Sequence, residues 1–85
     1  MVVKDMQVKI EEGLNVGTVA LFIQKASQFN SSIYLEYGNK KINAKSIMGM
    51  MTLNIPNGEE ISVLAEGDDE TDAISSIETY LCAAK

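Results

Sequence analysis

Apolar and polar residues alternate along the first ten positions of the chain. One side of residues 2–10 carries Val2, Met6, Val8 and Ile10, with Lys4 as the exception, and the other side carries Val3, Asp5, Gln7 and Lys9. Successive side chains of a strand point to opposite faces of a sheet, so a period of two is typical of a strand. The pattern predicts a first strand with one face towards water.

Two further stretches have the helical period instead. Asn15 and Thr18 are both suitable N-caps for a helix over residues 16–28, and an acidic turn at residues 68–70 suits the start of a last helix that continues to the end of the chain. The apolar positions that define the two helices are Val16, Val19, Ala20, Phe22, Ile23 and Ala26, then Ala73, Ile74, Ile77, Tyr80 and Leu81. Each helix is expected to bury this stripe.

The remaining segments read as three strands and a short helix. Residues 33–37 and 40–43 flank Gly38-Asn39, a two-residue connection typical of a hairpin. A short helix of about two turns is expected from Ile47 to Leu53, and residues 60–66 alternate as a fourth strand, with Leu64 on the polar side.

The element order predicts an α+β fold in a single domain that covers residues 1–85. Strand, helix, strand, strand, short helix, strand, helix is the split β-α-β layout, a four-stranded antiparallel sheet covered on one face by three helices. Tyr34 and Glu36 are expected on the open face. Because such a sheet has edge strands, either a monomer or a weak homodimer is expected.

Composition narrows the possible functions. The net charge is −5 and the seven basic residues form no run, which argues against binding to nucleic acid or an anionic membrane. No apolar stretch reaches about 18 residues, the length at which a spanning helix is considered, so a soluble, cytoplasmic protein is expected. With no histidine and only Cys82, the chain offers no nucleophile–base pair and no zinc ligand set. We therefore expect neither an enzyme nor a resident metal or cofactor; a weak cation site at residues 68–70 is conceivable, although carboxylates there are expected chiefly to cap the last helix.

The most unusual composition lies at residues 43–51, where Ser46 stands directly before an apolar run with three methionines. A serine at this place can cap the short helix while the run packs into the core. The same serine can alternatively be a phosphorylation switch beside a methionine-rich surface, since methionines suit surfaces that contact partners. The pattern by itself leaves both interpretations open.

The run Asn43-Ala44-Lys45-Ser46-Ile47-Met48-Gly49-Met50-Met51 resembles the regulatory-serine motif of the HPr family, the phosphocarriers of the sugar phosphotransferase system. The order of elements, residues 20–29 as the first helix, and Gly67 followed by acids agree with this family. The resemblance covers essentially the whole chain and implies the HPr-like open-faced sandwich.

HPr proteins carry phosphate on a histidine in a Gly-x-His-Ala-Arg-Pro pattern at the start of the first helix. In the matching residues 13–18, Asn15 stands at the histidine position, Gly17 at the arginine and Thr18 at the proline. An amide nitrogen is not nucleophilic, so this degenerate phosphocarrier site cannot take up phosphate. Three departures in one loop indicate a site left to drift.

A chain with the serine motif but no active histidine is similar to the Crh-like (catabolite-repression HPr-like) branch of the family. This likeness implies phosphorylation of Ser46 by HPr kinase/phosphorylase and binding of the phosphorylated form to the catabolite control repressor protein, as corepressor. It further implies that Ile47, Met48 and Met51 form an apolar docking patch, with Lys45 and Lys25 the nearest remaining cations by sequence.

Two alternatives remain at this stage. One is a protein–protein interaction module on the same scaffold that binds its partner without phosphorylation. The other is a small-molecule-binding domain, which would require a concave apolar pocket.

Overall fold

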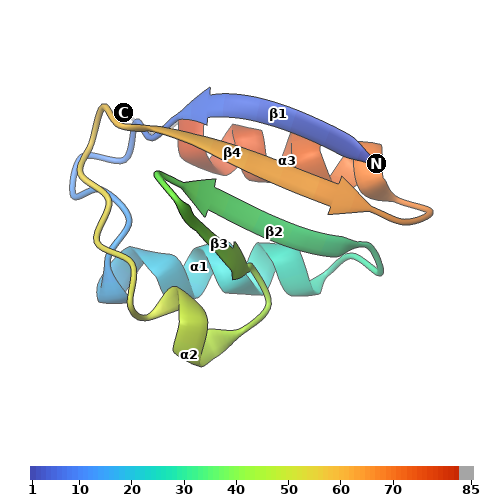
Figure 1. Cartoon of the computed structure of the whole chain (residues 1–85), viewed down its shortest axis with the longest axis horizontal. Helices are drawn as coiled ribbons and strands as arrows, with labels where there is room; N and C mark the ends of the chain where they lie inside the picture. Colours follow the sequence, from blue (N-terminus) through green and yellow to red (C-terminus); the bar gives the residue numbers. More distant parts are fainter. Residues whose placement is uncertain (83–85) are drawn as a thin grey trace.

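The computed structural model describes residues 1–82, and its elements follow in the predicted order. They are β1 (Val2–Gln7), α1 (Val16–Ser27), β2 (Ser32–Tyr37), β3 (Lys40–Asn43), α2 (Ile47–Met50), β4 (Glu60–Glu66) and α3 (Glu70–Cys82). Figure 1 shows the strands in front of the two long helices, with the short α2 beside α1. The predicted continuation of the last helix over residues 83–85 lies outside the described residues.

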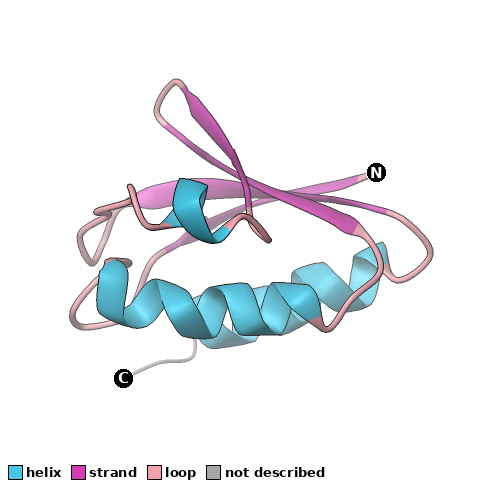
Figure 2. Ribbon diagram, turned by 90° about the horizontal axis from the view of Figure 1, so that it is seen from below, coloured by secondary structure: helices cyan, strands magenta, loops and turns pink. Residues whose placement is uncertain are grey.

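The four strands form one antiparallel sheet in the order β1-β4-β2-β3. β4 therefore pairs on both sides, while β1 and β3 are the edges. The helices lie on one face of the sheet, as Figure 2 shows from its edge. The predicted α+β architecture with an antiparallel sheet covered on one face is confirmed.

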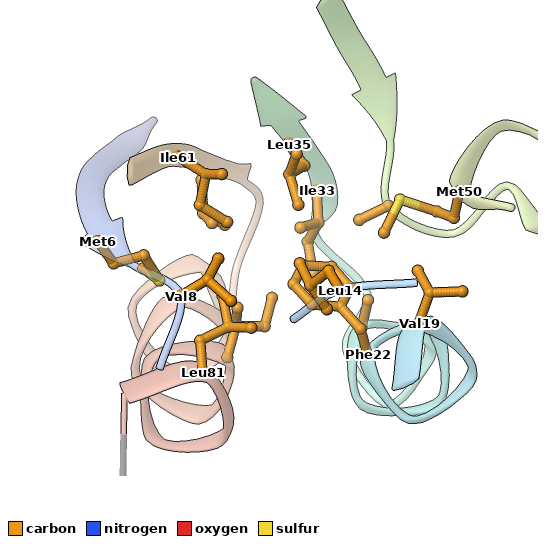
Figure 3. Packing of buried hydrophobic residues seen from close by; sticks show 14 of the residues in the cluster. Met6, Val8, Leu14, Val19, Phe22, Ile33, Leu35, Met50, Ile61 and Leu81 are labelled. Atoms are coloured by element: carbon orange, nitrogen blue, oxygen red, sulfur yellow. The ribbon is translucent and has the colours of Figure 1, made fainter. Parts of the chain in front are cut away.

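The core fills the layer between the sheet and the helices (Figure 3). Phe22 of α1 and Leu35 of β2 are fully buried, and burying a side chain of this size contributes roughly 1.5–3 kcal/mol. The labelled members of this core are Met6, Val8, Leu14, Val19, Phe22, Ile33, Leu35, Met50, Ile61 and Leu81. The buried positions of α1 are Val19, Phe22 and Ala26, which is only half of the predicted stripe.

Two elements end earlier than the sequence predicts. β1 stops at Gln7 rather than at residue 10, because the N–H of Lys9 donates to the carbonyl of Leu81 in α3 (2.9 Å) instead of continuing along β4. α2 stops at Met50 rather than at Leu53, because the N–H of Leu53 donates three residues back, to Met50 (3.0 Å). The longer elements were predicted from Val8, Ile10 and Leu53, which are indeed buried, but in loops.

The open face of the sheet is less uniformly exposed to solvent than the alternation of apolar and polar residues predicts. Leu64 is only 8% exposed, because it lies opposite Val3 of β1 and Tyr34 of β2 on the same face. Tyr34 is half-buried, and the ammonium of Lys41 lies 4.9 Å from the centre of its ring. Lys4, the exception in the first strand, reaches Glu78 of α3 with a nitrogen–oxygen distance of 2.8 Å.

The loop before α1 is held against the segment that follows α2. Leu14 and Ile55 exchange both backbone hydrogen bonds at 2.8 Å. Gly13 has φ +75°, and a Cβ there would lie 2.3 Å from the carbonyl oxygen of Ile55, so only glycine fits. This contact ties the loop before α1 to the segment between α2 and β4.

Candidate functional site

Ser46 is the N-cap of α2, as one of the two sequence interpretations expects. Its backbone is extended (φ −90°, ψ 110°), and its Oγ accepts the N–H of Gly49 at 3.3 Å. Its own carbonyl accepts the N–H of Met50, which is the first bond of the helix. The residue is half-buried, so the hydroxyl is held in place at the surface of the molecule.

The apolar run after Ser46 divides between the core and the surface. Met50 is fully buried and points inwards, towards Ile33 and Val19 (Figure 3). Ile47, Met48 and Met51 remain 60%, 83% and 48% exposed. The two interpretations of residues 43–51 are therefore compatible: one methionine anchors the helix, and three apolar side chains lie at the surface directly after the serine.

Part of this exposed surface continues onto α1 as a shallow groove. The α1–α2 groove has a volume of about 290 Å³, and its lining is entirely apolar: Val16, Val19, Ala20, Ile23, Ile47 and Met51. Val16 is 59% exposed, Ala20 is exposed and Ile23 is half-buried. The sequence assigned these three residues to the buried face of the helix, whereas they form a second stripe beside Val19, Phe22 and Ala26.

Neither lysine that the sequence placed near the serine has its charged group turned fully outwards. The Nζ of Lys45 donates to the carbonyl oxygen of Phe29, just beyond the end of α1, at 2.6 Å. The Nζ of Lys25 lies 5.9 Å from the centre of the Tyr80 ring. Lys45 thus serves first as a C-terminal cap for α1, where a cation suits the helix dipole.

Residues 13–18, the predicted degenerate phosphocarrier site, form an ordered helix start. The Oδ1 of Asn15 accepts the N–H groups of Gly17 (2.8 Å) and Thr18 (3.2 Å), while the Oγ1 of Thr18 accepts the N–H of Asn15 (3.0 Å). This reciprocal pair is a capping box. The Thr18 hydroxyl also donates to the Gly13 carbonyl at 2.6 Å. Two of the three departures, Asn15 and Thr18, therefore form a network that caps α1.

A residue of α3 holds the same helix start from the other side. The Tyr80 hydroxyl donates to the carbonyl of Thr18 at 2.8 Å. Burial, and to a smaller extent the charge of Glu12, raises the pKa of Tyr80, so the phenol stays protonated and keeps this bond at neutral pH. From the sequence, Tyr80 was predicted only as part of the apolar stripe of the last helix. Its spacing does not indicate the hydrogen bond to Thr18.

The acidic turn at residues 68–70 is occupied by contacts within the protein. Asp69 accepts the hydroxyl of Ser31, the N–H of Asn30 (2.9 Å) and the N–H of Ser31 (3.0 Å). The Ser31 hydroxyl and then the Asn30 N–H hold the pKa of Asp69 below its usual range, and the Gly67 N–H does the same for the pKa of Glu70. Asp69 thereby ties the start of α3 to the loop before β2, while Glu70 bonds to Gly67 and pairs with the N-terminus.

Residues 1–82 contain neither a group of metal-ligating side chains nor a helix that could span a membrane. No group of three or more histidine, cysteine, aspartate or glutamate side chains is placed to hold a metal ion there. Over the same residues, no helix has the length and apolar character needed to cross a membrane.

Comparison with known proteins defines the class of protein. The family model described as the PTS HPr component phosphorylation site matches residues 2–82. The chain belongs to the HPr family.

Among curated proteins, it is similar to the HPr-like protein Crh of Bacillus subtilis, with 41% identity over 81 residues that cover 95% of each chain. It is similarly related to the HPr-like protein Crh of Halalkalibacterium halodurans, with 43% identity over 95% of this chain and 96% of that one. The two relatives and the family model together confirm the resemblance inferred from residues 43–51.

Solved structures agree with the fold. The phosphocarrier protein HPr of Bacillus anthracis superimposes with a TM-score of 0.89 at 40% identity, over 94% of this chain and 95% of that one. Selenomethionyl Crh of Bacillus subtilis, described as an intertwined dimer with a swapping domain, superimposes with a TM-score of 0.76 at 39% identity, over 100% and 98% of the two chains.

Proposed function

We propose that Ser46 accepts a phosphoryl group from HPr kinase/phosphorylase and that the phosphorylated chain then binds the catabolite control repressor protein as corepressor in carbon catabolite repression. The observation that carries this proposal is the position of Ser46, whose surface hydroxyl directly precedes the exposed side chains of Ile47, Met48 and Met51. Membership of the HPr family and the likeness to HPr-like protein Crh support it.

A phosphate on Ser46 would act as a surface signal rather than by refolding the chain. It adds a charge of about −1.5 to −2 and three strong acceptor oxygens at a helix start, where negative charge is favourable. Core contacts of Met50 hold α2 in place irrespective of that charge. The partner would therefore meet a fixed apolar face with a new anion at its edge.

The cation that pairs with this phosphate is expected from the partner. Lys45 already donates to the carbonyl of Phe29, and Gly17 stands where the family has an arginine. Arginines of a partner bind a phosphate in bidentate fashion, which gives the contact both strength and direction. We accordingly assign Lys45 a positioning part at the docking surface, beside Ile47, Met48 and Met51.

We further propose that the chain is a regulatory phospho-acceptor and neither a phosphohistidine carrier nor an enzyme. Asn15 occupies the histidine position, and its side chain is engaged in the capping box with Thr18. A carboxamide nitrogen has no free lone pair with which to attack a phosphoryl group. Incubation with enzyme I and phosphoenolpyruvate should leave the chain unlabelled, and labelling would remove this part of the proposal.

The direct experiment is a kinase assay read by intact mass. Incubation with HPr kinase/phosphorylase and ATP should add one phosphate to the wild-type chain and none to Ser46→Ala. Ser75→Ala is the matched control, since Ser75 is an exposed serine on α3, and it should be phosphorylated like the wild type. A wild-type chain that stays at its original mass refutes the phosphorylation.

A constitutive interaction module is the alternative that the same surface permits. It predicts equal capture of the repressor by unmodified protein, Ser46→Ala and Ser46→Asp. The phosphorylation switch instead predicts strong capture only by the phosphorylated chain, with Ser46→Asp at most intermediate because a carboxylate carries less charge than a phosphate.

A small-molecule site is less well supported by the α1–α2 groove. Its volume of about 290 Å³ is at the lower limit of ligand pockets, which span roughly 300–1,000 Å³. The residues that line it are all apolar, whereas ligand pockets also carry a few polar groups that orient the ligand. The groove therefore suits an apolar side chain of a protein partner better.

A second copy of the chain is the remaining partner, and we propose a monomer in equilibrium with a weak homodimer. β1 and β3 are edge strands with unpaired backbone groups, and edges of this kind can pair with another chain. The dimeric structure of Crh from Bacillus subtilis supports this. Sedimentation over a range of concentrations tests it. We place the protein in the cytoplasm, with the proposed kinase and repressor.

A further inference from the structure

Gly49 lies one turn after Ser46, and its lack of a side chain leaves room beside the serine hydroxyl. A Cβ placed on Gly49 would lie 3.3 Å from the Oγ of Ser46, 3.6 Å from its Cβ and 3.1 Å from the Cγ2 of Ile42. The distance to Ile42 is shorter than ordinary carbon contacts of about 3.5–4.0 Å, and the distance to the Oγ is also tighter than most contacts of a Cβ. A methyl group at this position would thus press on the hydroxyl that we propose as the phosphate acceptor.

The backbone itself does not require glycine at this position. The glycines with positive φ are Gly13, Gly38, Gly58 and Gly67, and Gly49 is not among them. Within a helix, glycine is less favourable than alanine by about 0.8–1.0 kcal/mol. α2 has only four residues, so this disadvantage falls on a short element. The space beside Ser46 is what glycine supplies here and alanine would not.

Phosphoryl transfer requires free space around the Oγ of Ser46. The Oγ–phosphorus bond forms as the bond between the γ-phosphorus of ATP and the leaving ADP oxygen breaks, and the hydroxyl proton passes to a base of the kinase. The attacking oxygen must stand roughly in line with the leaving oxygen, with three equatorial oxygens around the phosphorus. Crowding on one side of Oγ restricts that approach.

We propose that Gly49 is a specificity-determining residue for modification of Ser46, because it keeps one side of the Oγ free for the incoming phosphoryl group. This inference rests on the proposed function. It concerns the space that the phosphorylated chain itself provides beside its acceptor oxygen. It also predicts the reverse reaction to be affected, since removal of the phosphate passes through the same surroundings of the same oxygen.

The test compares Gly49→Ala, Ile42→Ala and the double variant with the wild type in a timed reaction with HPr kinase/phosphorylase and ATP, read by intact mass. Gly49→Ala should be phosphorylated at least about tenfold more slowly, given that displacing a reacting group by about 1 Å can cost about 10²-fold. Ile42→Ala should react within about twofold of the wild type. The double variant should stay slow, because its alanine methyl still lies against the Oγ although the contact with Ile42 is gone.

Urea unfolding of each variant distinguishes an effect on access to the Ser46 Oγ from an effect on the stability of the fold. Gly49→Ala should unfold within about 1 kcal/mol of the wild type, because the gain in helix propensity offsets the two close contacts. The double variant relieves the tighter contact and so provides a folded protein even if the single variant is strained.

Phosphorylation of Gly49→Ala at the wild-type rate overturns the inference while the proposed function stands. Recovery of the rate in the double variant also overturns it, since Ile42 rather than access to Oγ would then be the cause. A wild-type chain that takes no phosphate refutes the proposed function and this inference with it.

Discussion

Replacement of Asn15 by alanine tests whether the capping box at the start of α1 stabilises the fold. The substitution removes the acceptor for the N–H groups of Gly17 (2.8 Å) and Thr18 (3.2 Å) and the donor to the carbonyl of Glu12 (3.1 Å). Loss of an N-cap costs about 0.5–2 kcal/mol. Because the side chain loses these bonds while the backbone N–H of residue 15 can still donate to Thr18, we expect the free energy of unfolding to fall by about 1–1.5 kcal/mol, with a decrease in Tm of roughly 5–10 °C for a domain of this size.

The assay is urea unfolding followed by circular dichroism. The midpoint should fall while the m-value stays constant, because the surface exposed on unfolding hardly changes. Gln24→Ala is the control, since Gln24 is exposed in the middle of α1, and it should remain within about 0.5 kcal/mol of the wild type.

A double-mutant cycle with Thr18→Val examines the reciprocity of the box. Asn15 and Thr18 contact each other through two hydrogen bonds, so their effects should be non-additive by at least about 0.5 kcal/mol. Additive effects would show that the two halves of the box act independently, and an Asn15→Ala variant as stable as the wild type would show that the Asn15 cap contributes nothing to stability.

Three other variants test contacts around the site. Asp69→Asn should destabilise the protein at neutral pH. The lowered pKa of Asp69 means that the carboxylate contributes stability above its unfolded pKa of about 3.9 and loses this contribution below it. The difference in unfolding free energy between the variant and the wild type should therefore narrow as the pH falls through that region. Met50→Ala should lower the free energy of unfolding by about 2–5 kcal/mol, and Met48→Ala by less than about 0.5 kcal/mol, because only the first is buried. Lys45→Met should destabilise by about 1 kcal/mol through loss of its bond to the carbonyl beyond α1.

Each of these has a result that contradicts it in the same unfolding experiments. A constant gap between Asp69→Asn and the wild type from pH 7 to pH 2 would mean that the carboxylate bonds to Ser31 and Asn30 do not stabilise the fold. Equal effects of Met50→Ala and Met48→Ala would contradict the division of the apolar run between core and surface. A Lys45→Met variant as stable as the wild type would mean that the bond from the Lys45 ammonium to Phe29 does not stabilise the fold.

Much of the fold was predictable because the chain keeps its local patterns simple. The alternation before Gln7 and the helical spacing from Ala73 to Leu81 each indicate one face, and the residues buried in β1 and α3 all belong to these faces. Element ends were less predictable, because β1 ends where Lys9 bonds to the end of α3, a contact between residues 72 positions apart. Such long-range backbone bonds leave no mark in a local pattern.

The candidate site was predictable in its residue types but not in its shape. Ser46 as a cap followed from its place before an apolar run. The groove did not, because Val16, Ala20 and Ile23 have the same spacing as buried residues of α1. The capping box was partly predictable, since two good caps were visible at Asn15 and Thr18.

The central position of β4 has a consequence for how the protein is made. Both neighbours of β4, β1 and β2, precede it in the sequence, so during synthesis from the N-terminus they have no central partner until residues 60–66 leave the ribosome. Before then only the β2–β3 hairpin can form its final strand pairing, and an isolated hairpin is marginal in water. The sheet should therefore assemble only once about three quarters of the chain has emerged, and nascent chains halted before Glu60 should be open to proteases.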